Sequence, residues 1–166
     1  MKTRRRTRLR PNAGRAAPIS PLDFMRLIWA VDHQMERVSK RMEARIGLTI
    51  PQRMSLLLIG RDEDMGAREL AQLLHLHPGT VSGIVGRLES AGLVIRTGDA
   101  ADARRWRLTL SRKGRRVNQR RAGTFEAATR RAMAAVSVQQ VAAAAHVLER
   151  LATELGVSCG VGQATR

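Results

Sequence analysis

The residues best suited to a chemical task lie in one short segment, 78–90. Its apolar residues recur with helical spacing, which predicts a helix with one buried face, formed by Val81, Ile84, Val85 and Leu88. The opposite face carries small and polar residues: Gly79, Thr80, Ser82, Gly83 and Arg87. Hydroxyl and guanidinium groups presented in this way can bond to base edges and phosphates of duplex DNA. We therefore expect this helix to read duplex DNA.

A basic hairpin is predicted directly after that helix. Residues 93–95 and the alternating residues 106–110 indicate two strands, and 98–103 is the turn between them. The hairpin residues proposed to act at DNA are Arg96, Asp102, Arg104, Arg105 and Arg107. Arginine is drawn into narrow minor grooves and also bonds phosphates, so the hairpin is a second candidate DNA contact.

The preceding helices are expected to position this pair of elements. A helix over 22–46 carries Phe24, Ile28 and Val31 at alternating spacings of four and three, which is typical of a coiled-coil seam or of a helix packed on its own domain. Thr49 and Gln52 predict a capping box, and Met54, Leu57 and Leu58 are the expected buried stripe of the helix that follows. A third helix, from Gly66 to about Leu74, precedes a turn at His75–His77.

Two long helices are expected after the hairpin. The first begins at Ser111 and opens with Arg112, Lys113, Arg115 and Arg116. The second begins at Ser137, and its apolar stripe includes Val141, Leu148 and Leu155.

Composition narrows the class of partner. The formal net charge is +16 and the sequence pI is about 11.8, which favours a polyanion such as nucleic acid over a merely solubilising charge coat. Aromatic residues make up only 2%, too few for the ring stacking that binds RNA and single strands. The single cysteine excludes a disulfide within the chain, and we expect no export signal and no membrane span. Location in the cytoplasm, at the nucleoid, is therefore predicted.

Several short sequence motifs, together with their order along the chain, resemble those of the MarR family of bacterial transcriptional regulators. They are Leu48–Gln52, Glu69–Leu74, Thr80–Ser82, Arg87–Glu89, Gly92–Val94, Asp102–Arg104 and Leu110–Gly114. The resemblance covers about residues 22–156. It departs from the family at His75, where glycine is frequent, and at His77, where serine is usual.

The resemblance implies a mainly α fold with a small β-hairpin wing. Residues 48–111 would form a winged helix–turn–helix domain, and 21–47 and 112–156 a helical dimerisation region. Outside the resemblance, the run of basic residues near the start predicts that 1–20 is a disordered basic arm, and we expect 157–166 to be a loose tail. The homodimer would bind a pseudo-palindromic operator in double-stranded DNA, most simply as a repressor. Its interface would include Phe24, Ile28, Val31, Val141, Leu148 and Leu155. In the wing, Asp102 would orient Arg104 toward the minor groove.

The resemblance also implies a small aromatic or phenolic effector. Its pocket residues would be Arg26, Trp29, His33 and Met54. We expect no enzyme activity, no cofactor and no metal site, because the four histidines are scattered and no nucleophile–base spacing is recognisable. The alternative function is a non-specific architectural or ribosome-associated protein that binds nucleic acid through its basic charge.

Overall fold

A computed structural model describes residues 18–62, 64–98 and 106–156. Its contacts divide the chain into two compact units, one ending at Gln34 and the other beginning at Met35. Helix α1 (Pro21–Ile46) starts in the first unit and ends in the second. Ser20 caps its start, because the Ser20 Oγ accepts a 3.1 Å hydrogen bond from the Asp23 N–H. Gly47, at φ +72°, ends the helix as predicted.

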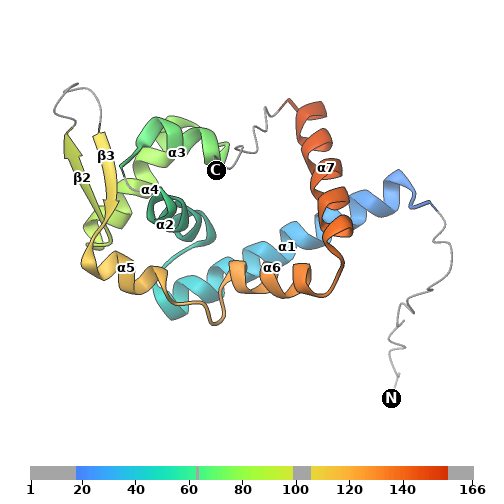
Figure 1. Ribbon diagram of the computed structural model, residues 1–166, viewed down its shortest axis with the longest axis horizontal. Helices are drawn as coiled ribbons and strands as arrows, with labels where there is room; N and C mark the ends of the chain where they lie inside the picture. Colours follow the sequence, from blue (N-terminus) through green and yellow to red (C-terminus); the bar gives the residue numbers. More distant parts are fainter. Residues whose placement is uncertain (1–17, 63, 99–105, 157–166) are drawn as a thin grey trace, which may run out of the picture. The chain divides into compact units, whose positions relative to one another are not determined.

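The second unit contains the remaining helices and a small sheet (Figure 1). Helices α2 (Ile50–Arg61), α3 (Ala67–Leu74) and α4 (Pro78–Ser90) precede a hairpin made of β2 (Val94–Gly98) and β3 (Trp106–Leu110). Helices α5 (Arg112–Asn118), α6 (Phe125–Ala134) and α7 (Val138–Glu154) follow. The predicted fold class, mainly helical with a β-hairpin wing, is confirmed.

The hairpin belongs to a three-stranded antiparallel sheet rather than standing alone. Strand β1 (Met65–Gly66) pairs with β3, so the strand order is β1-β3-β2. Met65 lies opposite Leu108, and Val94 lies opposite Leu110. Strand β1 was not predicted, because a segment of two residues has no detectable periodicity.

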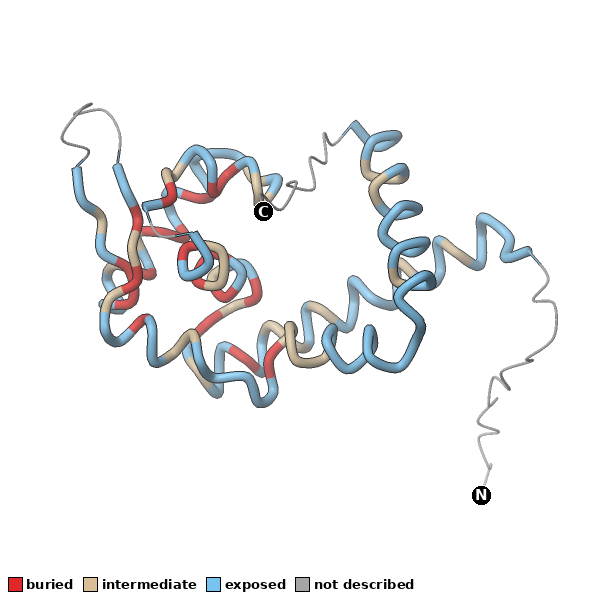
Figure 2. The backbone as a smooth tube through the Cα atoms, in the orientation of Figure 1, coloured by how far each residue is buried: buried red, intermediate tan, exposed pale blue. Residues whose placement is uncertain are grey.

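The hydrophobic core lies between α2, α3, α4 and the sheet (Figure 2). We call this packed body, together with α5, the lobe. Its fully buried side chains include Leu56, Ile59, Leu70, Val81, Val85, Leu88 and Leu108. Gly114 lets α5 pack closely against the rest of the lobe, because a Cβ at this position would overlap the Leu93 carbonyl oxygen. The α4 face that sequence periodicity assigns to the core is the face that is buried.

The predicted buried stripe of α2 is wrong. The buried residues of this helix are Ile50, Arg53, Ser55, Leu56 and Ile59. Met54 is 37% exposed, while Leu57 and Leu58 are only half-buried. Apolar residues occur on every side of α2, so helical periodicity does not identify the buried face. The arginine at position 53 makes the face that is actually buried look exposed in the sequence.

The expected long helix after the wing is also wrong, because the chain forms two helices there. Helix α5 ends at Asn118, and α6 begins after Thr124, whose Oγ1 accepts a 3.4 Å hydrogen bond from the Ala127 N–H. Gly123 lies between them at φ +74°, which a residue with a side chain rarely adopts. The helix that begins at the Ser137 capping box, predicted as the sixth, is therefore α7.

Candidate nucleic-acid interface

The turn between α3 and α4 is built from local hydrogen bonds. His75 adopts the left-handed conformation, with φ 51° and ψ 40°. The Leu76 N–H then donates to the Ala71 carbonyl at 3.0 Å, which closes a Schellman-type helix end. The His77 Nδ1 accepts a 3.2 Å hydrogen bond from the Gly79 N–H, so this histidine caps α4 in place of the usual serine.

The predicted recognition face of α4 is exposed. Gly79, Thr80, Ser82, Gly83 and Arg87 all lie on it, opposite the buried residues of the same helix. A Cβ added at Gly83 or Gly86 would meet nothing within 4 Å, so packing inside this chain does not require glycine at either position. Ser90 is turned back on its own helix, where its Oγ donates to the Gly86 carbonyl at 2.9 Å.

The wing is fastened to α4 at its base. The Arg96 Nη2 donates a 2.8 Å hydrogen bond to the Glu89 Oε2, and the Arg96 guanidinium carbon lies 5.7 Å from the ring centre of Trp106. The Arg96 Nε is buried without a hydrogen-bond partner among the described residues. Arg96 therefore connects α4, β2 and β3 from within the lobe. Its guanidinium is engaged there, and its role in a DNA contact stays a prediction.

The other predicted wing residues are placed differently. Arg107 projects from β3, and its Nη1 lies 3.5 Å from the Asp64 Oδ2. Asp102, Arg104 and Arg105 lie outside the described residues.

The base of the wing is also joined to α5. The Ser111 Oγ donates to the Gly92 carbonyl at 2.6 Å and accepts from the Gly114 N–H at 2.9 Å. The Lys113 Nζ donates to the Ala91 carbonyl at 2.8 Å. These bonds bring the C-terminal end of α4 and the start of α5 together, so that the recognition helix and the wing are presented by one connected framework.

Sequence reasoning missed Arg53, a buried charged residue where α2 meets the end of α5 and the start of α6. Its side chain is only 1% exposed. The guanidinium donates to the carbonyls of Val117, Asn118 and Arg120 at 3.0, 3.0 and 2.8 Å. The Val117 and Asn118 carbonyls lie in the last turn of α5, where a helix has few internal donors left, and the Arg120 carbonyl lies just beyond it. The only signal in the sequence is the interruption of an otherwise apolar helix by one arginine.

Glu126 completes the arrangement around Arg53. The Arg53 Nε and Nη2 both donate to the Glu126 Oε1, at 2.9 and 2.5 Å. Partial burial raises the pKa of Glu126, but the hydrogen bonds and the positive charge of Arg53 outweigh it, so this pKa lies below its ordinary value. The Glu126 Oε2 is buried and has no hydrogen-bond partner among the described residues.

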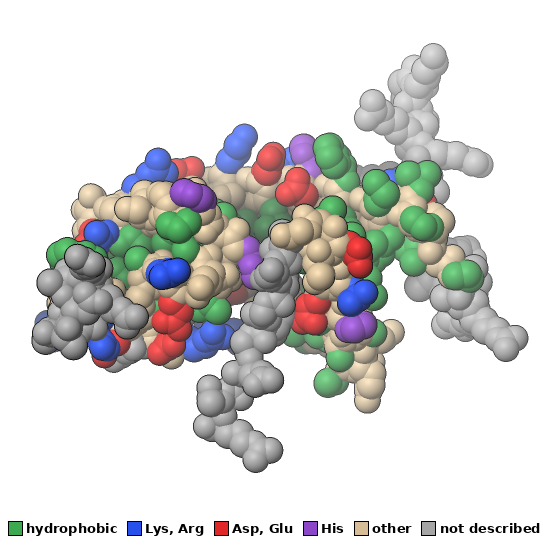
Figure 3. Space-filling view, turned by 90° about the horizontal axis from the view of Figure 1, so that it is seen from above, with side chains coloured by type: hydrophobic (Ala, Val, Ile, Leu, Met, Phe, Trp, Pro, Cys, Tyr) green, Lys and Arg blue, Asp and Glu red, His purple; other side chains and the backbone are tan. Residues whose placement is uncertain are grey.

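None of the predicted dimer-interface residues is fully buried within the chain. In the first unit Phe24 and Ile28 are half-buried and Val31 is exposed. On α7, Val141 is half-buried and Leu148 is exposed, and Leu155, which caps the end of this helix, is 73% exposed. Hydrophobic side chains remain visible on the molecular surface (Figure 3).

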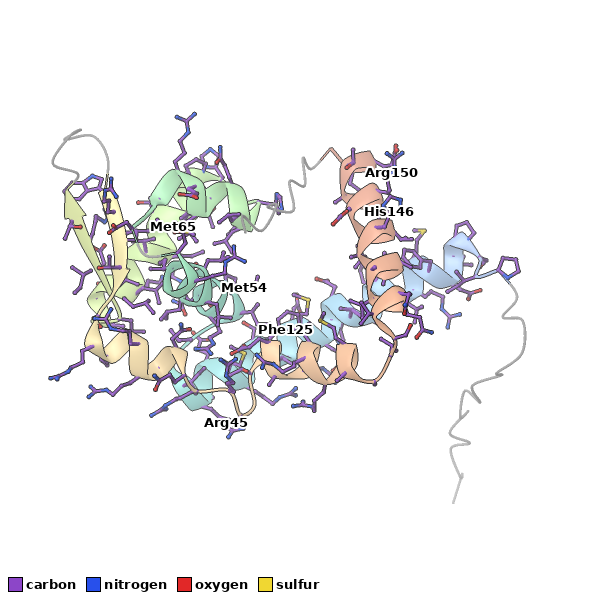
Figure 4. The ribbon with its side chains drawn as sticks, in the orientation of Figure 1. Arg45, Met54, Met65, Phe125, His146 and Arg150 are labelled. Carbon is purple, nitrogen blue, oxygen red and sulfur yellow. The ribbon has the colours of Figure 1, made fainter. Side chains whose placement is uncertain are left out.

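The four predicted effector-pocket residues fall in different units. Arg26, Trp29 and His33 lie on exposed positions of α1 in the first unit, and Trp29 is 76% exposed. Met54 lies on α2 in the second unit (Figure 4). The effector pocket therefore stays a prediction.

Neither a metal site nor a membrane-spanning helix is found among the described residues. No group of three or more His, Cys, Asp or Glu side chains there is placed to hold a metal ion. None of the helices in that part of the chain is both long and apolar enough to cross a membrane.

Comparisons with known proteins agree with this geometry. Residues 46–105 match the model of the MarR family. The HTH-type transcriptional regulator TtmR of Methylorubrum extorquens is 33% identical over 88 residues, which are 53% of this chain and 45% of TtmR. The HTH-type transcriptional repressor Rv2887 of Mycobacterium tuberculosis is 27% identical over 109 residues, covering 66% of this chain and 78% of the repressor. The matched segment thus spans about half the length of TtmR.

The fold is shared with solved structures along most of the chain. CouR from Rhodococcus jostii RHA1, bound to p-coumaroyl-CoA, superposes with a TM-score of 0.64 at 25% identity, over 78% of this chain and 92% of CouR. The order of elements, the HTH turn and the wing therefore agree with the sequence match. The sequence match over residues 46–105 and the shared winged helix–turn–helix fold together make the chain similar to MarR-family transcriptional regulators.

Proposed function

We propose that the protein is a sequence-specific, double-stranded DNA-binding repressor. The observation that carries the proposal is α4, which is held in the lobe by one face and offers Thr80, Ser82 and Arg87 on the other. Hydroxyl and guanidinium groups on such a face bond base edges in the major groove. The net charge of +16 supplies the attraction to phosphates that accompanies this contact.

The proposed assembly is a homodimer on a pseudo-palindromic operator. Large apolar side chains on α1, α6 and α7 are exposed in the single chain, and Val138 on α7 is 81% exposed. A soluble monomer rarely leaves so many such residues uncovered. Residues 21–47 and 112–156 would supply the dimer contacts, and two lobes would present two recognition helices to half-sites about one helical turn apart.

Base discrimination by this recognition helix is expected to be modest. Two of its outward positions, Gly83 and Gly86, carry no side chain, so few groups reach base edges. The wing supplies the remaining contacts in this proposal: Arg104, oriented by Asp102, enters the minor groove, and Arg105 and Arg107 contact phosphates. Arg96 instead holds the wing against α4.

A small aromatic or phenolic effector is proposed as the signal that releases DNA. Support comes from CouR, a relative in fold that was solved with p-coumaroyl-CoA bound. Arg26, Trp29, His33 and Met54 are the candidate contacts. The protein acts by binding and not by catalysis, and it works in the cytoplasm, at the nucleoid.

The deciding experiment selects bound sequences from a random duplex library and footprints the selected site. A regulator protects one discrete, two-fold symmetric site of about 20–30 base pairs, as expected for two half-sites about one turn apart. Uniform coating of the duplex, with no enriched sequence, contradicts the proposal and favours the architectural alternative.

A further inference from the structure

The corner between α5 and α6 is held by charged hydrogen bonds instead of apolar packing. Arg53 of α2 reaches into this corner and bonds three carbonyl oxygens of residues 117–120 and the Glu126 carboxylate. Arg45 and Phe125 lie nearby, where the end of α1 meets the start of α6 (Figure 4). Arginine is the only residue whose side chain carries five N–H donors in a fixed planar group. Several donors of this kind are needed to bond three carbonyls and a carboxylate at once.

Helix α6 depends on this corner for its direction. Within Phe125–Ala134 no residue is buried, so α6 has no apolar face sunk into the lobe. Besides the Arg53–Glu126 ion pair, the Phe125 N–H donates to the Met42 sulfur at 3.3 Å, and the N-cap Thr124 is buried. Directional bonds at the first turn of α6 therefore set the angle at which the chain leaves the lobe.

Arg53 is equally well anchored at its other end. Its neighbours on α2, Leu56 and Ile59, are fully buried in the lobe core, against α4 and the sheet. The side chain thus connects the body that carries the recognition helix to the helix that leads into α7. On the proposed function, α7 belongs to the dimer interface.

We propose that Arg53 and Glu126 are positioning residues that set the distance and rotation between the two recognition helices of the dimer. The dimer would therefore prefer operators with one spacing between half-sites, although neither residue contacts DNA. This inference rests on the proposed homodimeric repressor. One base pair inserted between half-sites moves their centres by about 3.4 Å and rotates them by about 34°, so a rigid corner discriminates spacing strongly.

The experiment measures binding to a series of duplexes built from the selected operator. The spacing between half-sites is decreased by one base pair, left unchanged, or increased by one. The proteins are wild type, Glu126→Gln, Arg53→Lys and the control Asp62→Asn. Asp62 is exposed at the C-terminal end of α2, outside the helices proposed for the dimer interface, so its change removes a comparable charge away from the corner.

Wild type and the control are expected to prefer one spacing by about tenfold or more, similar to the effect of one mismatched base pair. Glu126→Gln and Arg53→Lys should reduce this ratio to about threefold or less, while a duplex with one half-site binds all four proteins within about twofold. The amide of Glu126→Gln still accepts a hydrogen bond from Arg53, so this variant is the one expected to fold even if Arg53→Lys does not.

Light scattering confirms which variants are dimers before the ratios are compared. A spacing ratio in folded, dimeric Glu126→Gln that equals the wild-type ratio overturns the inference, even if its affinity is uniformly lower. A wild-type dimer without spacing preference overturns it as well. Failure of the proposed function looks different, because wild type then protects no discrete two-fold symmetric site at all.

Discussion

Arg96 of β2 and Glu89 of α4 form an ion pair with a 2.8 Å contact, and it joins the wing to the recognition helix. The guanidinium also lies over Trp106 of β3. Each side chain is about one-third exposed, so the pair is screened and contributes little to global stability. Its main effect is on the position of the wing.

We therefore expect Arg96→Ala to weaken operator binding more than it lowers stability. The free energy of unfolding should fall by about 1 kcal/mol or less, since exposed ion pairs and cation–π contacts are weak. Operator affinity, measured by fluorescence anisotropy, should fall about tenfold through loss of wing placement. Arg61→Ala, which removes an exposed arginine at the end of α2, is the matched control. Equal operator affinity in the two variants would contradict the role assigned to Arg96.

The glycines on the exposed face of α4 are predicted to lower the free energy of unfolding, although no packing contact in the chain requires them. Gly83→Ala should raise the free energy of unfolding by about 0.5–1 kcal/mol, because the added methyl group meets open space and alanine favours the helix. Gly114→Ala should instead lower it by about 1–3 kcal/mol, since its methyl group would overlap the Leu93 carbonyl. Urea denaturation compares the two.

Operator measurements on the same variant test how α4 reads DNA. If the backbone at Gly83 approaches the groove closely, Gly83→Ala is more stable yet binds the operator more weakly. Base substitutions at the central major-groove positions should each cost little, because few side chains reach them. Losses of several kcal/mol at each of these positions would refute modest discrimination by α4.

The cap formed by His77 is expected to tolerate serine and not alanine. His77→Ala removes the acceptor for the Gly79 N–H and should cost about 1 kcal/mol of unfolding free energy. His77→Ser restores an acceptor of the preferred type and should match or exceed wild type. Thermal unfolding of the three proteins decides this, and equal stability of alanine and serine variants would rule out a capping role.

We expect the folded protein to lose stability in acid as Glu126 becomes protonated. Its pKa is lower in the folded chain than the ordinary value of about 4.3, so the ionised carboxylate stabilises the fold. That contribution is fully present above the unfolded pKa and disappears as the pH falls through the folded pKa. Unfolding measured from about pH 6 downward should show the gap between wild type and Glu126→Gln narrowing below about pH 4.3. A gap independent of pH would exclude this linkage.

Salt dependence should report the size of the phosphate contact. If the dimer neutralises about eight phosphates, log K falls with log salt at a slope near −7. Removing residues 1–17, which hold seven basic residues and no acidic one, should make the slope shallower if this arm grips DNA. A wild-type slope shallower than about −3 would exclude joint contact by the arm and the wing.

Much of the DNA-facing surface follows from local sequence. The buried and exposed faces of α4 follow from helical spacing, and the helix starts at Ser111 and Ser137 follow from side chains that bond their own first turn. The strand β3 follows from alternation, since Leu108 and Leu110 are buried and Arg107 is not. Each of these features is decided within a few residues, which is why periodicity and capping predict them.

Tertiary structure alone decided how the chain turns after α5 and which face of α2 is buried. Arg53 and Glu126 are 73 positions apart in sequence, and Arg53 and the Val117 carbonyl are 64 apart. A buried guanidinium is stable only when such distant acceptors surround it, so its burial cannot be inferred from neighbours in sequence. The same holds for β1, whose two residues form a strand only because β3 lies beside them.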